Sequence, residues 1–407
     1  MCRVCVLAFV LIAVAAGAIV LAGASAGDTP SGRSGLSGVA RPTSAVAARI
    51  DDPFFRVVHG FGGTRPAQEG ARRRVMVLNV RDAAMIPRLK AGNPGLKVLM
   101  YVDMMSADPR DPDGESDWVG YTDASQNHPE WFLRDAKGNP LVFKDYPTSR
   151  VMDVGNAAYQ DAGAARVSGL AVSDGFDGVF LDDTSASLSW VIAGGEAACV
   201  TYPTTVMWQA AVYSFLTNVA PKLRSAGLLV VANIGGSTIT RGLWKAWNGP
   251  IDGAMEESFT NAGAGRDSIA NGQWPAKLGH ALWSEANGKI ALDHAVTATR
   301  GGARYGLATM LLVAGGKNLY SASKGYVHEA WWPEYTTTNA LGTPRGSYRV
   351  LKNGVYRRDF THGVVLVNPH AKVARVVRFG RPYRGSGLGR TKSVTLEPTT
   401  GVVLLKS

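Results

Sequence analysis

Short apolar runs, separated by longer segments with helical spacing, constrain the fold of this chain more than any other feature. Such runs lie at residues 75–79, 97–103, 150–155, 178–182, 228–233, 252–257, 289–294 and 318–320. Continuous apolar runs are typical of parallel strands that helices cover on both faces. Strands that alternate with helices eight times in this way predict an α/β fold, namely a closed (β/α)8 barrel.

Most of these runs end in a polar residue, and this recurrence predicts a functional site. In a barrel the carboxyl ends of all strands meet at one mouth, where barrel enzymes carry out their chemistry. A single such residue would be interpreted as a turn or helix-cap residue, but a recurrence in seven runs is harder to explain in that way. The residues are Asn79, Asp103, Asp153, Asp182, Asn233, Glu256 or Glu257, and Asp293.

The segment 174–183 contains the most informative run. An apolar Val-Phe-Leu sequence is followed directly by Asp182 and Asp183. This pair is a candidate catalytic group, although Asp-Asp-Thr-Ser is also good helix-capping chemistry. Glycoside hydrolysis usually needs two carboxyl groups, one to protonate the leaving oxygen and one to attack the sugar or to activate water.

Carboxylates at the ends of the fourth and sixth runs can face each other across a barrel mouth. Because side chains alternate along a strand, we expect only one member of each acidic doublet to point inward. Asp182 is the preferred nucleophile, with Asp183 as a substrate ligand or a helix cap. Glu257 is the preferred acid, with Glu256 as the second candidate. The acid role requires a pKa raised by burial and by a second carboxylate.

The other polar strand ends are predicted to bind sugar hydroxyls, and a tryptophan is predicted to pack against a sugar ring. All ten tryptophans fall between residues 118 and 332, and several lie in expected strand-to-helix loops. Pockets favour aromatic side chains, whereas ordinary packing explains others, such as Trp208 on an expected helix. The predicted substrate-binding residues are Asp183, Asp103, Asn79, Asp153, Asn233, Asp293 and Trp131.

Residues 1–26 have the features of a secretory signal peptide. Arg3 precedes a long apolar stretch, and small residues precede a cleavage position after Ala26. A secreted or cell-surface location is therefore expected, with no membrane contact after cleavage. An uncleaved anchor is the alternative, because the apolar stretch is long. Residues 27–48 are rich in Gly, Ser, Ala, Pro and Thr, which predicts a flexible linker.

The catalytic barrel is expected over residues 49–344, and a different pattern begins at residue 345. Several β-rich runs follow, separated by turn signals such as Asn353-Gly354 and Asn368-Pro369. They predict a small antiparallel, β-sandwich-like domain over residues 345–407. This segment carries no cluster of reactive side chains, so we expect it to have a structural role.

Composition and motifs argue against several other functions. The formal net charge is +11, but the basic residues are scattered, and the run at residues 72–74 fits a solvated loop better than a nucleic-acid site. Beyond the signal only Cys199 remains, so no internal disulfide is possible. The chain lacks a Gly-x-Ser-x-Gly elbow, a phosphate loop and a His-Glu-x-x-His motif. Its seven histidines show no metal-ligand spacing, so no metal or other cofactor is expected.

Several segments resemble a known group of barrel glycosidases. Residues 175–183, Gly-Phe-Asp-Gly-Val-Phe-Leu-Asp-Asp, are similar to the fourth-strand signature of glycosidases related to the endo-α-1,4-polygalactosaminidases, and the similarity extends to a bacterial glycosyl hydrolase-like family. Residues 127–133 (Asn-His-Pro-Glu-Trp-Phe-Leu), 153–160, 231–235 and 255–259 fit the same pattern. The resemblance covers roughly residues 50–405. It implies a secreted TIM-barrel glycosidase with Asp182 as nucleophile and one glutamate of the doublet as acid/base.

The sequence therefore predicts a secreted glycoside hydrolase that cleaves O-glycosidic bonds of a poly- or oligosaccharide, with retention expected. Carboxyl groups about 5–5.5 Å apart would favour retention, and about 6.5–9.5 Å inversion. The alternative is a catalytically inert barrel that binds cell-surface glycans, which would keep its glycan when Asp182 and Glu257 are replaced. A deacetylase or lyase would need a metal cluster or a Tyr/Lys base, and the sequence shows neither.

Overall fold

A computed structural model describes residues 54–56, 65–260, 273–323 and 331–407 of the chain. The predicted signal peptide (1–26) and linker (27–48) lie outside the described residues. Among the helices that the structure describes, none combines the length and the apolar character needed to cross a membrane.

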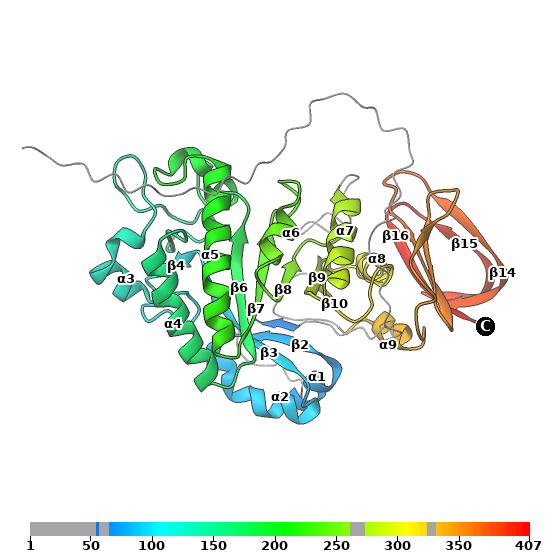
Figure 1. Ribbon diagram of the computed structural model, residues 1–407. Helices are drawn as coiled ribbons and strands as arrows, with labels where there is room; N and C mark the ends of the chain where they lie inside the picture. Colours follow the sequence, from blue (N-terminus) through cyan, green and yellow to red (C-terminus); the bar gives the residue numbers. More distant parts are fainter. Residues whose placement is uncertain (1–53, 57–64, 261–272, 324–330) are drawn as a thin grey trace, which may run out of the picture. The chain divides into compact units, whose positions relative to one another are not determined.

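Eight parallel strands form the central sheet (Figure 1), and they follow one another in the order β1-β2-β3-β6-β7-β8-β9-β10. Each strand therefore lies beside its predecessor in the sheet, as in a (β/α)8 barrel. The strands are β1 (Phe54–Arg56), β2 (Val75–Leu78), β3 (Lys97–Asp103), β6 (Gly178–Ser185), β7 (Leu229–Gly235), β8 (Gly253–Glu256), β9 (Ile290–Val296) and β10 (Asn318–Ser323).

Side chains from most of these strands meet in one inner core, which shows that the sheet curls round on itself. The two ends of the strand order also approach each other. The Arg74 guanidinium lies just before β2 and donates a hydrogen bond of 2.8 Å to the carbonyl of Gly316, which lies just before β10. The buried inner core consists of Val75, Val77, Leu99, Phe180, Val231, Met255, Leu292 and Leu319. The predicted (β/α)8 fold is confirmed.

One predicted barrel strand is wrong. Residues 150–155 do not join the barrel: β5 (Arg150–Val151) pairs antiparallel with β4 (Ser106–Ala107) in a separate two-stranded sheet. The run ends early because the Asp153 carboxylate accepts a hydrogen bond of 3.1 Å from the Gly155 amide, which closes a turn. The first barrel strand is instead β1, so β6 to β10 keep their predicted ranks of fourth to eighth.

The segment between β3 and the next long helix is an excursion (residues 104–156) that carries only short elements. Its helical parts are α3 (Tyr121–Asn127) and the 3-10 helix η2 (Pro129–Trp131). The remaining helical elements of the barrel region are α1 (Pro66–Arg72), η1 (Val80–Met85), α2 (Ile86–Gly92), α4 (Ala157–Ser173), η3 (Leu188–Trp190), η4 (Gly195–Ala198), α5 (Thr205–Ser225), α6 (Leu243–Asn248), α7 (Gln273–Ala286), α8 (Arg300–Leu311) and α9 (Pro333–Asn339).

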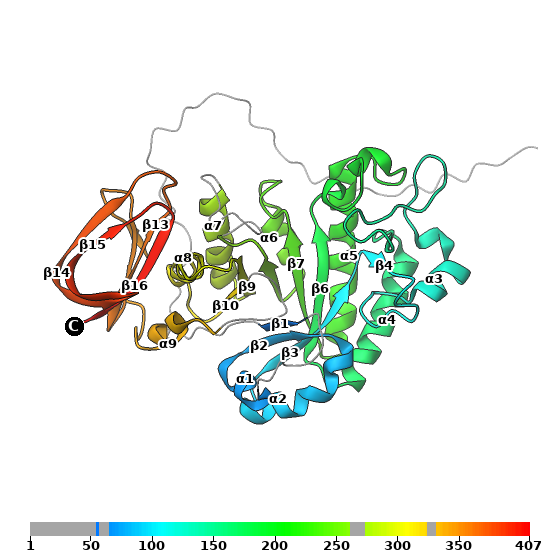
Figure 2. The same ribbon diagram turned by 180° about the vertical axis from the view of Figure 1, so that it is seen from behind.

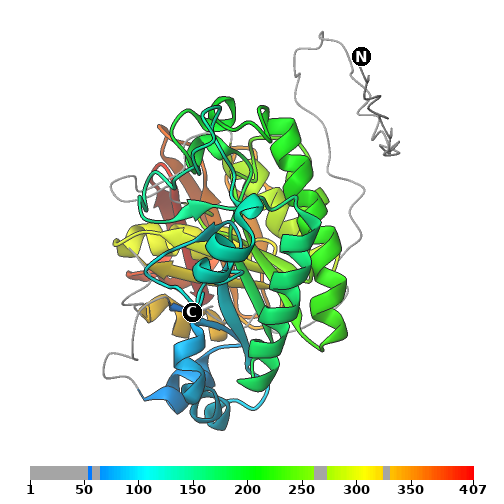
Figure 3. The same cartoon turned by 90° about the vertical axis from the view of Figure 1, so that its left-hand side faces the viewer.

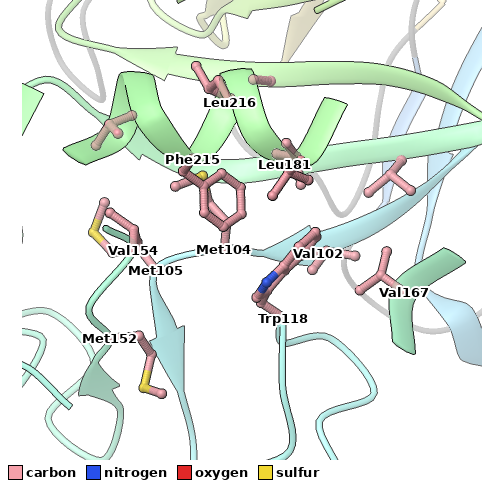
Figure 4. Close-up of a cluster of buried hydrophobic side chains, with 14 of the residues drawn as sticks. Val102, Met104, Met105, Trp118, Met152, Val154, Val167, Leu181, Phe215 and Leu216 are labelled. Atoms are coloured by element: carbon pink, nitrogen blue, oxygen red, sulfur yellow. The ribbon is translucent and has the colours of Figure 1, made fainter. Parts of the chain in front are cut away.

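A large hydrophobic cluster joins the excursion to the helices that cover the sheet. Helices α4 and α5 run side by side along β6 (Figures 2 and 3). Trp118, from the excursion, is fully buried between them and β3, close to Val102 and Val167 (Figure 4). Its indole N–H donates to the Tyr159 carbonyl at 3.2 Å, and its ring meets that of Phe215 edge-on at 5.0 Å. This packing fixes the excursion against the barrel.

The C-terminal strands form a six-stranded antiparallel sheet in the order β11-β12-β13-β16-β14-β15. Buried side chains of β13 and β16 share a hydrophobic cluster with helix α8 of the barrel. The buried Arg358 adds two hydrogen bonds to carbonyls at the end of that helix, those of Leu311 at 2.9 Å and Ala314 at 2.7 Å. The strands are β11 (Arg349–Val350), β12 (Tyr356–Asp359), β13 (Gly363–Asn368), β14 (Arg375–Gly385), β15 (Leu388–Leu396) and β16 (Thr400–Lys406).

Two glycines of α4 give a matched test of the Trp118 packing. A Cβ added at Gly163 would lie 1.9 Å from the Trp118 indole nitrogen, whereas a Cβ at Gly169 would have no heavy atom within 4 Å. Gly169→Ala should therefore raise the unfolding free energy by about 0.5–1 kcal/mol, the usual gain in a helix. Gly163→Ala should lower it by about 1–3 kcal/mol because the core is overpacked. Urea denaturation measures both, and equal effects would contradict the proposed packing.

Candidate active site

A cavity of about 720 Å³ opens where strands β3, β6 and β8 end. Acidic side chains dominate its wall, with two arginines among them. The excursion supplies much of the wall, and the strand ends supply the floor. The lining residues are Arg81, Tyr101, Asp103, Ser106, Asp108, Arg110, Asp111, Ser116, Asp117, Phe143, Asp145, Tyr146, Ser149, Asp182, Asp183, Trp190 and Glu257.

Strand alternation holds for one acidic doublet and fails for the other. At the end of β8, Glu257 lines the cavity and Glu256 does not, as alternation requires. At the end of β6, both Asp182 and Asp183 line it. The expectation of one inward aspartate is therefore wrong. Asp183 has a φ of 56°, and the pairing of β6 with β7 shifts register between Leu181 and Thr184, so a bulge turns both carboxyl groups the same way.

Asn233 connects the two acids that the sequence selects as the catalytic pair. Its side-chain amide nitrogen donates to Asp182 Oδ1 at 2.8 Å and to Glu257 Oε2 at 3.1 Å. Asn233 lies on β7, between the strand that carries Asp182 and the strand that leads to Glu257. The two acids, remote from each other in the chain, are thus held around one amide nitrogen.

Several donors converge on Asp182 and oppose the effect of its burial. Burial, followed by the charge of Glu257, raises the pKa of Asp182 to about 6. The Asn233 amide and the Asp183 backbone N–H donate to its carboxylate and act in the opposite direction. Burial and the surrounding acids raise the pKa of Tyr101 well above its usual value, so its hydroxyl stays protonated and also donates to Asp182. Asp182 is consequently an anion above about pH 6.

Asp103 and Asp183 have contrasting environments within the same acidic group. Asp103 accepts hydrogen bonds from the Met105 amide at 2.8 Å and from the Ser106 hydroxyl at 2.5 Å, but burial still raises its pKa. For Asp183, burial and then the charges of Asp103, Asp182 and Glu257 raise the pKa far above normal. The Asp183 carboxyl group therefore holds its proton to a higher pH than an exposed aspartate does.

Glu256 belongs to a buried ion pair away from the cavity. Its carboxylate lies 2.9 Å from the Lys277 ammonium, and it accepts a hydrogen bond from the Ser237 hydroxyl at 2.5 Å. His280, which stacks on Trp244, has its Nδ1 atom 3.3 Å from the same carboxylate oxygen that Ser237 contacts. Burial raises the pKa of Glu256, but these partners outweigh it, and the net shift is downward. The geometry gives Glu256 a role in joining β8 to α7.

Several predicted sugar ligands lie away from the cavity. Asp153 accepts hydrogen bonds from Tyr202 and from Gly155, because the strand expected to carry it to the barrel mouth is not part of the barrel sheet. Trp131 is buried and stacks on His128, with ring centroids 3.9 Å apart. Of the substrate-binding set, Asp103 and Asp183 line the cavity, whereas the buried Asn79, Asn233 and Asp293 and the two excursion residues do not.

Sequence patterns missed most of the cavity wall. Asp108, Asp111, Asp117 and Asp145 come from the excursion, and the only local signal was the acidic, proline-containing segment 108–113. Burial, followed by the charge of Asp103, raises the pKa of Asp117 to about 8.

In the described part of the chain no group of three or more His, Cys, Asp or Glu residues is arranged to hold a metal ion.

Trp190 gives the cavity an accessible aromatic face. It is 45% exposed, and its ring lies over Gly236, where an added Cβ would come within 2.3 Å of the ring. The φ of 74° at Gly236 is also one that glycine adopts most easily. A flat ring held against backbone in this way can pack against the apolar face of a ligand.

The architecture is that of a (β/α)8-barrel protein with an acid-lined cavity at the carboxyl ends of its strands. The fold is similar to that of an Anoxybacillus alpha-amylase (11% identity, TM-score 0.51, 88% of this chain and 98% of that chain). It is also similar to an alpha-amylase from Lactobacillus plantarum (12% identity, TM-score 0.50, with the same coverage of 88% and 98%). Identities this low show a shared fold and nothing about substrate.

The family is shown by a second comparison. Residues 90–364 match GHL15, hypothetical glycosyl hydrolase family 15, and the match covers more than half of the chain. The protein therefore belongs to this family, and its membership supports glycoside hydrolase activity. A search of curated proteins finds no match.

Replacing each glutamate of the doublet should separate their two roles. Glu256→Gln leaves the buried Lys277 ammonium without its anion and should lower the unfolding free energy by about 3–5 kcal/mol. Glu257→Gln is the matched control, because it removes a carboxylate that faces Asp182 and should not lower stability. Chemical denaturation at pH 7 measures both, and an equal loss in the two variants would contradict these assignments.

Asp183→Asn should stabilise the protein in a pH-dependent way. The pKa of Asp183 is raised in the folded protein, so its contribution to stability is complete below the pKa of the unfolded chain and is lost as the pH rises. Asparagine removes that loss and tolerates a positive φ. We expect no gain in melting temperature near pH 3.5 and a gain on the order of a few degrees at pH 8. A gain that is the same at both pH values would show that charge is not its cause.

Proposed function

We propose that this protein is a retaining glycoside hydrolase in which Asp182 is the nucleophile and Glu257 the acid/base. The observation that carries the proposal is the shared amide of Asn233. The bonded oxygens of Asp182 and Glu257 cannot be farther apart than the 2.8 Å and 3.1 Å bonds placed end to end. Bonded oxygens this close favour the ~5–5.5 Å carboxyl separation of retaining enzymes over the ~6.5–9.5 Å of inverting enzymes, which need room for a water molecule between the carboxyl groups.

The nucleophile role of Asp182 follows from the hydrogen bonds that it receives. Asp182 accepts from the Asn233 amide, the Asp183 backbone and the Tyr101 hydroxyl, and all three favour its anion. An anion at this position can attack the anomeric carbon while Glu257 protonates the departing oxygen. Glu257 then removes a proton from the water that hydrolyses the glycosyl–enzyme ester.

The charge of the cavity favours neutral or cationic sugars over acidic ones. Eight carboxyl groups line it, and the two arginines are engaged by acids. Arg110 lies 2.6 Å from Asp108, and Arg81 lies 3.4 Å from Glu115. A uronic acid would meet like charge from ionised wall acids such as Asp108, whose pKa is lowered mainly by the hydrogen bond from Arg110, whereas an amino sugar would be attracted to them. The resemblance to the polygalactosaminidases points to the same class of substrate.

The N-terminal segment supports secretion of the proposed hydrolase. Residues 1–26 combine a basic start, an apolar stretch and small residues before the expected cleavage position, which supports secretion. A secreted hydrolase would meet extracellular or cell-wall polysaccharide. N-terminal sequencing of the protein from the culture medium would detect cleavage after Ala26.

Hydrolysis of a polysaccharide panel tests the function. Neutral and amino-sugar polymers should release reducing ends, and uronic-acid polymers should release few. Asp182→Asn should lower kcat by at least about 10³-fold, and Asp174→Asn, remote from the cavity, is the control. The acidic limb of kcat/KM should fall near pH 6, because Asp182 must be ionised to attack. Glycan binding without turnover would instead support the inert barrel.

Azide rescue assigns the two acids. In Asp182→Ala, azide occupies the space left by the nucleophile and should give a glycosyl azide of inverted configuration. In Glu257→Ala it should give the retained configuration, because the covalent intermediate still forms. Rescue with the opposite stereochemistry would exchange the two roles.

A further inference from the structure

Asn233 is placed between the two acids by the register of three neighbouring strands. It lies opposite Met255 on β8, which directly precedes the acidic doublet, and the residue before it, Ala232, lies opposite Leu181 on β6. Its side chain is 7% exposed, and it is not part of the cavity wall. A substrate hydroxyl in the cavity therefore meets Asp182 and Glu257 rather than Asn233.

The orientation of the Asn233 amide is set by the acids alone. Its Oδ1 atom is buried and accepts no hydrogen bond from any residue that the structure describes. The opposite orientation would point this oxygen at two carboxylates and leave the donors unused. Since buried polar atoms normally have partners, an orphaned oxygen indicates that the two donors determine how this side chain lies.

We infer that Asn233 is a positioning residue: its two amide hydrogens fix the separation of Asp182 and Glu257 and favour the anionic form of the nucleophile. This inference rests on the proposed function and replaces the sugar-binding role predicted from the sequence. One oxygen of each acid is engaged by the amide. The acids are then held at a separation that suits covalent attack before any sugar binds.

Other groups also act on the nucleophile, and a test must separate their effects. Asp103 and Tyr101 approach it from β3, Asp183 from its own strand, and Glu257 from the end of β8. Tyr146 interacts with the acids from the excursion, and the buried His294 interacts with Glu257 from β9. All of these groups remain in the protein when Asn233 alone is replaced.

Asn233→Ala and Asn233→Asp provide the test in the full-length protein. Without the amide, kcat should fall about 10–100-fold with little change in KM. The acidic limb of kcat/KM should move up by about one pH unit, because the Asp182 anion loses a donor. Asn233→Asp keeps the size of the side chain but adds a third acid beside Asp182 and Glu257. It should therefore shift the acidic limb of kcat/KM further than Asn233→Ala does. A residue that only fills space would tolerate aspartate better than alanine.

The matched control is Asn248→Ala. Asn248 is also buried and also has an orphaned Oδ1, but its amide contacts Ser284 rather than an acid. This variant should lose stability without moving the acidic limb. A rise in KM with an unchanged limb in Asn233→Ala would overturn the inference and restore the sugar-ligand role.

A second readout does not depend on activity. The Asn233 bond to Asp182 stabilises the folded protein when Asp182 is ionised, which is above about pH 6. Asn233→Ala should therefore cost more stability at pH 8 than at pH 5, and Asn248→Ala should cost the same at both. Equal costs for Asn233→Ala would overturn the inference. Asn233→Ala could cost more stability at pH 8 than at pH 5 while no glycan is hydrolysed. In that case the proposed function fails, but the role of Asn233 in positioning the two acids stands.

Discussion

The site depends on the repulsion between buried carboxyl groups and on the few donors that offset it. Asp103, Asp182, Asp183 and Glu257 meet at one end of the barrel, and burial is the largest cause of every raised pKa among them. Donors oppose the rise at Asp182, where the pKa is about 6, whereas at Asp183 the surrounding acids add to the effect of burial and raise the pKa well above its usual value. The orphaned oxygen of Asn233 costs about 1–3 kcal/mol, which the two charge-assisted bonds offset.

The two neighbouring glutamates show how one strand end serves stability and chemistry separately. Glu256 has a lowered pKa, so the stability it contributes is present above the pKa of the unfolded chain and is lost on acidification. Asp183 has the opposite linkage, because its raised pKa makes its contribution complete in acid and lost as the pH rises. The two residues therefore contribute opposite slopes to the pH dependence of stability. Glu257 can then face the cavity while its neighbour anchors β8 to α7.

Sequence patterns predict the position of a residue where the backbone geometry repeats from strand to strand, and they fail where the backbone is irregular. Strand ends repeat around a barrel, so the positions of Asp182 and Glu257 at one mouth follow from the order of the apolar runs. The side-by-side aspartates depend on a positive φ at Asp183, which breaks the alternation that guided the prediction. Asp153 was expected at the barrel mouth because a short apolar run in the excursion resembles a barrel strand. Asp293 was expected at a strand end, but it lies buried in the middle of β9.

The contrast between residues on barrel strands and residues of the excursion also separates the catalytic residues of the site from those that determine substrate selectivity. Asp182, Asn233 and Glu257 lie on or directly after adjacent strands whose register fixes them, so their geometry changes little when loops change. Half of the acids in the wall come from the excursion, which is held to the barrel by the packing of Trp118 and by a short backbone bridge between Asp117 and Asp103 of β3. Substitutions in the wall can therefore alter which sugar is accepted without moving the acids. A long excursion after the third barrel strand is thus the part of this fold in which substrate selectivity can vary while the carboxyl pair and its shared amide stay in place.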